Sequence, residues 1–169
     1  MTVDSFKYLP RLIALIYELQ EPELRIPIPW TSLPEPVSRC KFGLVTTGGL
    51  FHKSLEAPFD ITREMAEPTW GDPTYRTIPL KISQEEVGVS HLHVNTSYAE
   101  ADLNVLLPVK RFQELERQGI IGGLANNHYS FMGYQGYPPD TNAWHQKYGP
   151  QVARKFLDEG VNCVLLTPS

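Results

Sequence analysis

The chain has 169 residues, 41% of them hydrophobic, and a formal net charge of −4 at pH 7. This length suffices for one domain with a buried core, and the acidic balance argues against a nucleic-acid binder because no basic face stands out. No apolar run approaches the roughly 20 residues of a membrane span, and the start lacks the order of a secretion signal. Two cysteines far apart do not form a disulfide framework, so we expect a cytoplasmic protein with one domain over residues 1–169.

The first 36 residues divide into a predicted helix and a proline-rich arm. Apolar residues recur at helical spacing over 5–20, which predicts an amphipathic helix that covers a sheet. Prolines at 22, 27, 29, 34 and 36 exclude both a helix and a central strand in the segment that follows. We expect this arm to be an irregular connection and not a domain boundary.

The first predicted strand, 41–46, leads into a loop that contains two glycines. Gly48 and Gly49 let the backbone turn tightly and approach a ligand closely. Ligands of open parallel sheets bind outside the carboxyl ends of strands, so we expect this loop to form one wall of a site. The substrate-binding candidates here are Thr46, Thr47, Gly48, Gly49 and, three residues further on, His52.

The middle of the chain is loop-rich as far as residue 83, with an edge strand predicted at 75–80 because a proline is tolerable there. A clearer unit follows. A helix is predicted to begin at Pro108 and to end at Gly119, with a buried strand at 122–127 after it.

Polar residues flank this helix and strand on both sides, which suggests a site. His91 and His93 are two residues apart, so in an extended segment both imidazoles leave the same face. Asp102 and Asn104 repeat this spacing before the helix, and His128 and Ser130 follow the strand.

The last third of the chain predicts a helix over 149–160 with Val152, Ala153, Phe156 and Leu157 facing inward. The continuous apolar run at 161–166 is typical of a strand buried on both faces, and Thr167 follows at its carboxyl end. The alternation of strands and helices predicts an α/β fold, with three layers and a mostly parallel sheet. Its central strands would be 41–46, 122–127 and 161–166.

Four segments carry a family resemblance. They are LVTTGG at 44–49, the two histidines with ADLN at 101–104, PVKRFQELERQGIIGGLANNHYSFMG at 108–133 and GPQVARKFLDEGVNCVLLTPS at 149–169. In this order they resemble the B subunit, the selenoprotein subunit, of the glycine, sarcosine, betaine and D-proline reductases, and more closely its short single-domain relatives.

The resemblance implies reductive cleavage of a carbon–heteroatom bond in a small substrate, with a thioredoxin-like dithiol as the electron source. It places a selenocysteine or cysteine nucleophile directly after Ser169, so we expect the 169-residue chain to stop short of it and to be inactive. His91, His93 and His128 would protonate the leaving group or orient a carboxylate. A partner reductase subunit and a homo-oligomer stay open.

Two alternatives remain beside the reductase. His91, His93 and Asp102 are residue types that suit zinc or iron, as in a metal-dependent hydrolase. No further ligand has a diagnostic spacing, so we expect no bound metal and no other cofactor. The second alternative is a non-catalytic subunit that keeps the fold and binds a small molecule.

Overall fold

The computed structural model describes residues 11, 15 and 31–169. The chain divides after Ser32, and the fold described below is that of the unit Leu33–Ser169. The helix predicted at 5–20 and most of the proline-rich arm lie outside the described residues, so both stay predictions. No helix within the described part is long and apolar enough to cross a membrane.

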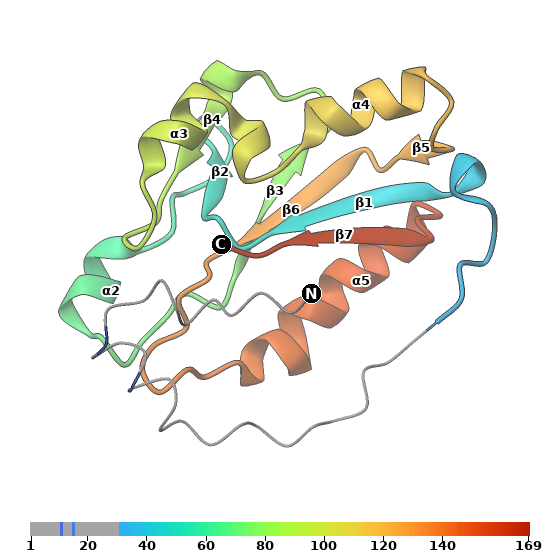
Figure 1. Ribbon diagram of the computed structural model, residues 1–169. Helices are drawn as coiled ribbons and strands as arrows, with labels where there is room; N and C mark the ends of the chain where they lie inside the picture. Colours follow the sequence, from blue (N-terminus) through green and yellow to red (C-terminus); the bar gives the residue numbers. More distant parts are fainter. Residues whose placement is uncertain (1–10, 12–14, 16–30) are drawn as a thin grey trace. The chain divides into compact units, whose positions relative to one another are not determined.

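A mostly parallel sheet forms the centre of the unit (Figure 1), with five strands among the described residues. The strand β1 (Lys41–Thr46) pairs in parallel with three others, and β3 (Tyr75–Pro79) closes one edge by antiparallel pairing with β6. The strands parallel to β1 are β5 (Gly123–Leu124), β6 (Asn127–Phe131) and β7 (Cys163–Thr167). The predictions of a mostly parallel sheet and of an edge strand near residue 75 are confirmed.

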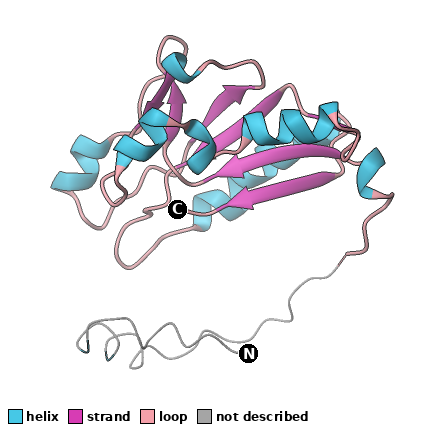
Figure 2. Cartoon of the chain, turned by 45° about the horizontal axis from the view of Figure 1, so that its top comes forward, coloured by secondary structure: helices cyan, strands magenta, loops and turns pink. Residues whose placement is uncertain are grey.

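One long helix covers each face of the sheet, as the two views in Figures 1 and 2 show. The helix α4 (Val109–Arg117) packs over the core around Leu44 and Ile78. On the opposite face, α5 (Gly149–Asp158) packs over Tyr129 and Phe131. The three-layer α/β fold is therefore confirmed.

Shorter elements occupy the connections. β2 (Leu50–His52) and β4 (Val87–Val89) form an antiparallel pair. The short helices are α2 (Ile61–Ala66), α3 (Thr96–Ala101), the 3-10 turns η2 (Val37–Arg39), η3 (Gln84–Glu86) and η4 (Leu103–Val105), and the π-helical turn η5 (Trp144–Tyr148).

The bounds of α4 follow from its flanking residues. Pro108 is the residue just before the helix and not its first member as predicted, and Val109 is its buried first residue. At the other end Gly119 has φ +68°, which confirms the predicted left-handed stop.

The prediction for β7 is wrong in one respect: the strand lies at an edge of the sheet and is not buried on both faces. Val164 is 46% exposed and Leu166 is 68% exposed, and the only pairing of β7 among the described residues is with β1. The inward positions of α5 are likewise Val152 and Phe156, whereas Leu157 is 65% exposed and Ala153 is also exposed. A continuous apolar run therefore does not separate a central strand from an edge strand.

The strand predicted at 122–127 is also misplaced. The chain pairs with β1 at Gly123–Leu124, leaves the ladder, and resumes as β6 over Asn127–Phe131. This extension of the strand was not predicted because His128 and Ser130 are polar. Both side chains are nonetheless fully buried within β6.

Candidate active site

The carboxyl ends of β1, β6 and β7 converge at one end of the sheet, where the last residue of the chain also lies (Figure 1). The backbone N–H of Thr47 donates to Thr167 O at 3.3 Å, which joins the end of β1 to the end of β7. The N–H of Gly49 donates to Phe131 O at 3.0 Å, which joins the same loop to the end of β6. This edge is where open parallel sheets bind ligands.

The loop after β1 has a shape that its side chains and glycines determine. Thr46 Oγ1 donates to Thr167 O at 3.1 Å and accepts from the N–H of Gly48 at 3.1 Å. Gly49 has φ +66°, and a Cβ there would collide with Ser90 O. The loop can therefore lie directly against the segment that carries the two histidines, and the N–H of Ser90 donates to Gly49 O at 2.9 Å.

Gly133 brings the loop, the last residue and a histidine to one point. Thr47 Oγ1 accepts from the N–H of Ser169 at 2.8 Å and donates to Ser169 O at 3.3 Å. A Cβ at Gly133 would lie 2.6 Å from Ser169 O, 3.3 Å from Thr47 O and 3.4 Å from His91 Nε2. Because Gly133 has no side chain, Ser169 O, Thr47 O and His91 Nε2 can all lie close to it.

His91 offers an unused hydrogen-bond donor at this point. The residue is only 8% exposed, and its Nδ1 accepts from the backbone N–H of His93 at 3.1 Å. A neutral ring must then carry its proton on Nε2. Burial, with the neighbouring His93, lowers the pKa of His91, so the ring is neutral near pH 7. Its Nε2 is buried and has no hydrogen-bond partner among the described residues.

His93 lies at the exposed rim of the same loop. Its ring stacks on Tyr134 with a centroid distance of 4.8 Å, and it stands 6.0 Å from the ring of His91. His93 Nε2 is 3.3 Å from Glu64 Oε1, an oxygen of a carboxylate whose side chain is 2% exposed. Glu64 could not be identified from the sequence, because a single glutamate on a six-residue helix belongs to no motif.

His128 and Ser130 lie inside the sheet. His128 is fully buried, and its Nδ1 accepts from the backbone N–H of Leu44 at 3.3 Å. Ser130 Oγ accepts from the backbone N–H of Leu50 at 2.8 Å. Burial lowers the pKa of His128 to about 4, so this ring is neutral under ordinary conditions. These contacts hold both side chains within the sheet, while Nε2 of His128 has no hydrogen-bond partner among the described residues.

The remaining candidates make local contacts that do not join them to the His91 loop. His52, on β2, accepts at Nδ1 from the N–H of Ser54 at 3.2 Å. Asp102 accepts from the N–H of Asn104 at 3.0 Å and caps η4. Asn104 Oδ1 accepts from the N–H of Lys110 at 2.9 Å and so shapes the start of α4. The structure thus brings together Thr47, Gly48, Gly49, His91 and His93, with Thr46 and Thr167 supporting the loop.

A metal site would need at least one more ligand beside the two histidines. Within 31–169 and at positions 11 and 15, no group of three or more His, Cys, Asp or Glu side chains could hold a metal ion. Asp102, the third ligand of the metal-hydrolase alternative, is engaged with Asn104 at the start of η4. That alternative therefore has no geometric support among the described residues.

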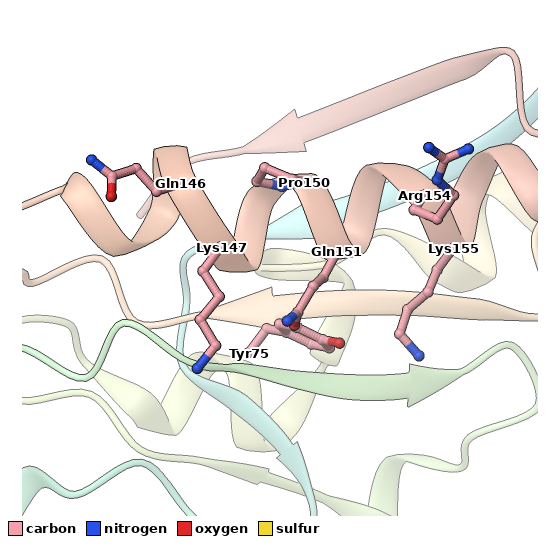
Figure 3. A pocket seen from close by; sticks show the side chains of 7 residues that line it. All are labelled: Tyr75, Gln146, Lys147, Pro150, Gln151, Arg154 and Lys155. Carbon is pink, nitrogen blue, oxygen red and sulfur yellow. The ribbon is translucent and has the colours of Figure 1, made fainter.

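A wide pocket of about 650 Å³ lies elsewhere, along α5 (Figure 3). Lys147 of η5 and Gln151 and Lys155 of α5 point toward the side where Tyr75 of β3 lies. None of the residues predicted to form the site lines this groove, whose full lining is Tyr75, Gln146, Lys147, Pro150, Gln151, Arg154 and Lys155. The groove along α5 and the strand ends around His91 are therefore separate parts of the described structure.

Comparison with known proteins gives one family over most of the chain. Residues 22–169 match the model of the glycine/sarcosine/betaine reductase selenoprotein B family. The chain is 30% identical to D-proline reductase subunit gamma of Acetoanaerobium sticklandii over 86% of its own length and 57% of the relative. It is 25% identical to glycine reductase complex component B subunit gamma of Peptoclostridium acidaminophilum, over 88% of its own length and 33% of that relative. The chain therefore spans little more than half, or only a third, of these proteins. No solved structure matches.

Proposed function

The chain belongs to the glycine/sarcosine/betaine reductase selenoprotein B family, and from this premise we propose that it is a subunit of a reductase for a small amino acid or a close derivative. The relatives are named for D-proline, glycine and sarcosine and as subunits or components of complexes. We extend both features to this chain: a substrate of this class and at least one partner subunit. The family match over residues 22–169, with the unused donor of His91 at the strand ends, carries this proposal.

The proposed reaction is reductive cleavage of a bond between carbon and nitrogen. A dithiol, carried by a thioredoxin-like protein, supplies two electrons and two protons and becomes a disulfide. The carbon and the nitrogen each gain one hydrogen as their bond breaks, so atoms and electrons balance. The neutral His91 suits the binding of a substrate carboxylate through Nε2–H, and His93 at the rim suits proton delivery to the leaving nitrogen.

The proposed nucleophile is a selenocysteine or cysteine bonded directly to Ser169. Ser169 contacts Thr47 and lies against Gly133, so the next residue would begin beside His91. The two cysteines of the chain are not placed for this role. Cys40 directly precedes β1 and Cys163 begins β7, both at the opposite end of these strands.

The test adds one cysteine after Ser169, with a serine added at the same place as the matched control. Both chains are assayed for dithiothreitol-dependent reduction of D-proline, glycine and sarcosine, alone and together with a reduced thioredoxin and the other subunits of the D-proline and glycine reductase complexes. We expect turnover of at least one substrate with the added cysteine and none with the added serine. Equal rates in the two chains would show that the proposed nucleophile is wrong.

A non-catalytic binding subunit is the second candidate, because neither cysteine of this chain lies at the strand ends that form the site. It predicts that calorimetry detects substrate binding to both extended chains while neither turns the substrate over. Absence of both binding and turnover for all three substrates would contradict the substrate class.

A further inference from the structure

The carboxylate of Glu64 is buried and has no role in the reaction proposed above. Its side chain is 2% exposed, and it is the one buried residue of α2. The oxygen Oε1 has no hydrogen-bond donor among the described residues. A buried carboxylate without a donor is unfavourable by several kcal/mol unless something pairs with it, so its presence calls for an explanation.

His93 approaches this oxygen with one ring nitrogen. Nε2 of His93 lies 3.3 Å from Glu64 Oε1, within ion-pair distance but not aligned as a hydrogen bond. The imidazole is exposed on its other side and stacks on Tyr134, whose hydroxyl donates to Pro68 O. The ring is therefore held between a fixed aromatic face and a buried carboxylate, while one part of it stays open to solvent.

We propose that Glu64 is a positioning residue for His93, holding its imidazole at the rim of the strand-end site with the proton on the nitrogen that faces the carboxylate. This inference rests on the proposed function, since it gives His93 its part in delivering a proton to a leaving nitrogen. Carboxylates that orient a histidine through one ring nitrogen fix both its tautomer and its direction. A small rotation of the ring would bring Nε2–H into line with Oε1.

The charged groups around Glu64 and His93 decide how these two side chains respond to pH. Burial raises the pKa of Glu64, the nearby His93 opposes this rise, and Asp72 adds to it. His93 itself faces Glu64 from α2 and His91 from its own loop. A carboxyl with a raised pKa in the folded state destabilises the protein as pH rises above its unfolded pKa, so the ionised form weakens the fold at pH 8.

The direction in which stability changes with pH distinguishes a positioning role of Glu64 from a structural role. If Glu64 serves the site, Glu64→Gln should melt at least as high as the wild type at pH 8 while losing activity. If Glu64 serves the fold, the same substitution should lower Tm at every pH. Glu67→Gln is the matched control, because Glu67 ends the same helix in an exposed pair with Arg63 and should leave both Tm and activity unchanged.

The activity arm uses the chain with the cysteine added after Ser169. We expect Glu64→Gln to lower kcat by about tenfold to a hundredfold, the order found when a residue that orients an active histidine is changed, with KM changed less than threefold. Glu64→Asp should recover part of kcat. An unchanged kcat in an active enzyme would overturn the positioning role and leave the proposed function standing.

The stability arm decides the inference even if no substrate is turned over. Tm is measured for Glu64→Gln, His93→Gln and the double variant at pH 6 and pH 8, which gives the coupling between the two side chains. We expect a coupling of about 2–4 °C at both pH values, because Glu64 and the imidazole that it orients are in direct contact. No coupling at either pH would overturn the pair. Coupling without turnover by the chain that carries the added cysteine would keep the pair and reject the proposed function.

Discussion

The pH dependence of stability should reveal how deeply His128 is buried. Burial lowers its pKa to about 4 from an ordinary 6.5, so the folded state holds the neutral ring more tightly than the unfolded chain does. The stabilisation is fully present above pH 6.5 and is lost as pH falls toward 4, because the unfolded chain then binds a proton that the folded chain refuses. At pH 4.5 the loss relative to pH 7.5 is about 2.5 kcal/mol for these two pKa values.

The variant His128→Asn isolates this effect. The amide oxygen of asparagine can still accept from the N–H of Leu44, but the side chain does not titrate. The free energy of unfolding is measured in urea at pH 7.5 and 4.5, for the wild type, for this variant and for His145→Asn, an exposed control. We expect the acid-induced loss to be about 2.5 kcal/mol smaller in His128→Asn than in the wild type, and unchanged in His145→Asn. Equal losses in wild type and His128→Asn would refute the burial argument.

Two pairs of substitutions test the fold around the site. Gly49→Ala should lower Tm far more than Gly119→Ala: both glycines have positive φ, but only at Gly49 would the Cβ also strike Ser90 O, and nothing lies within 4 Å at Gly119. Equal Tm values would contradict the close approach of the loop to the histidine segment. Leu166→Ser should change the free energy of unfolding by about 0.5 kcal/mol or less, because Leu166 is 68% exposed, whereas Leu44→Ala should lower it by about 2–5 kcal/mol. A large loss at Leu166, seen by urea unfolding, would mean that the edge of the sheet is covered.

Much of the fold was predictable because its signals are local. The strand 41–46 has the predicted bounds, and the stop of α4 at Gly119 is encoded by one residue that tolerates positive φ. The edge position of β7 was not predictable, because an apolar run reports the side chains of one strand and not its neighbours. His128 and Ser130 misled in the same way: their polarity suggested a loop, while the backbone N–H groups of Leu44 and Leu50, far away in sequence, donate to them inside the sheet.

The candidate site residues were predictable only where they follow the ends of strands. The loop at Thr47–Gly49 and the histidine pair lie together because two strands and a loop end at one edge of the sheet. Asp102 and Asn104 share the spacing of the histidines yet cap a helix, since spacing alone does not say which backbone N–H is near. Glu64 is the converse case, since it belongs to no sequence pattern and yet lies buried beside His93. Its burial depends on how α2 packs against residues about thirty positions away, which no short pattern records.

The central claim is that the substrate binds at the strand ends beside His91, and one measurement addresses it without requiring turnover. The chain is labelled with ¹⁵N in its histidine rings, the signals of His91 and His128 are assigned with His91→Asn and His128→Asn, and D-proline, glycine or sarcosine is added. We predict that the ligand moves the Nε2 signal of His91, whose donor has no partner among the residues that the structure describes, and leaves His128 in the core unmoved. A ligand that binds by calorimetry while the His91 signal stays in place would contradict this account.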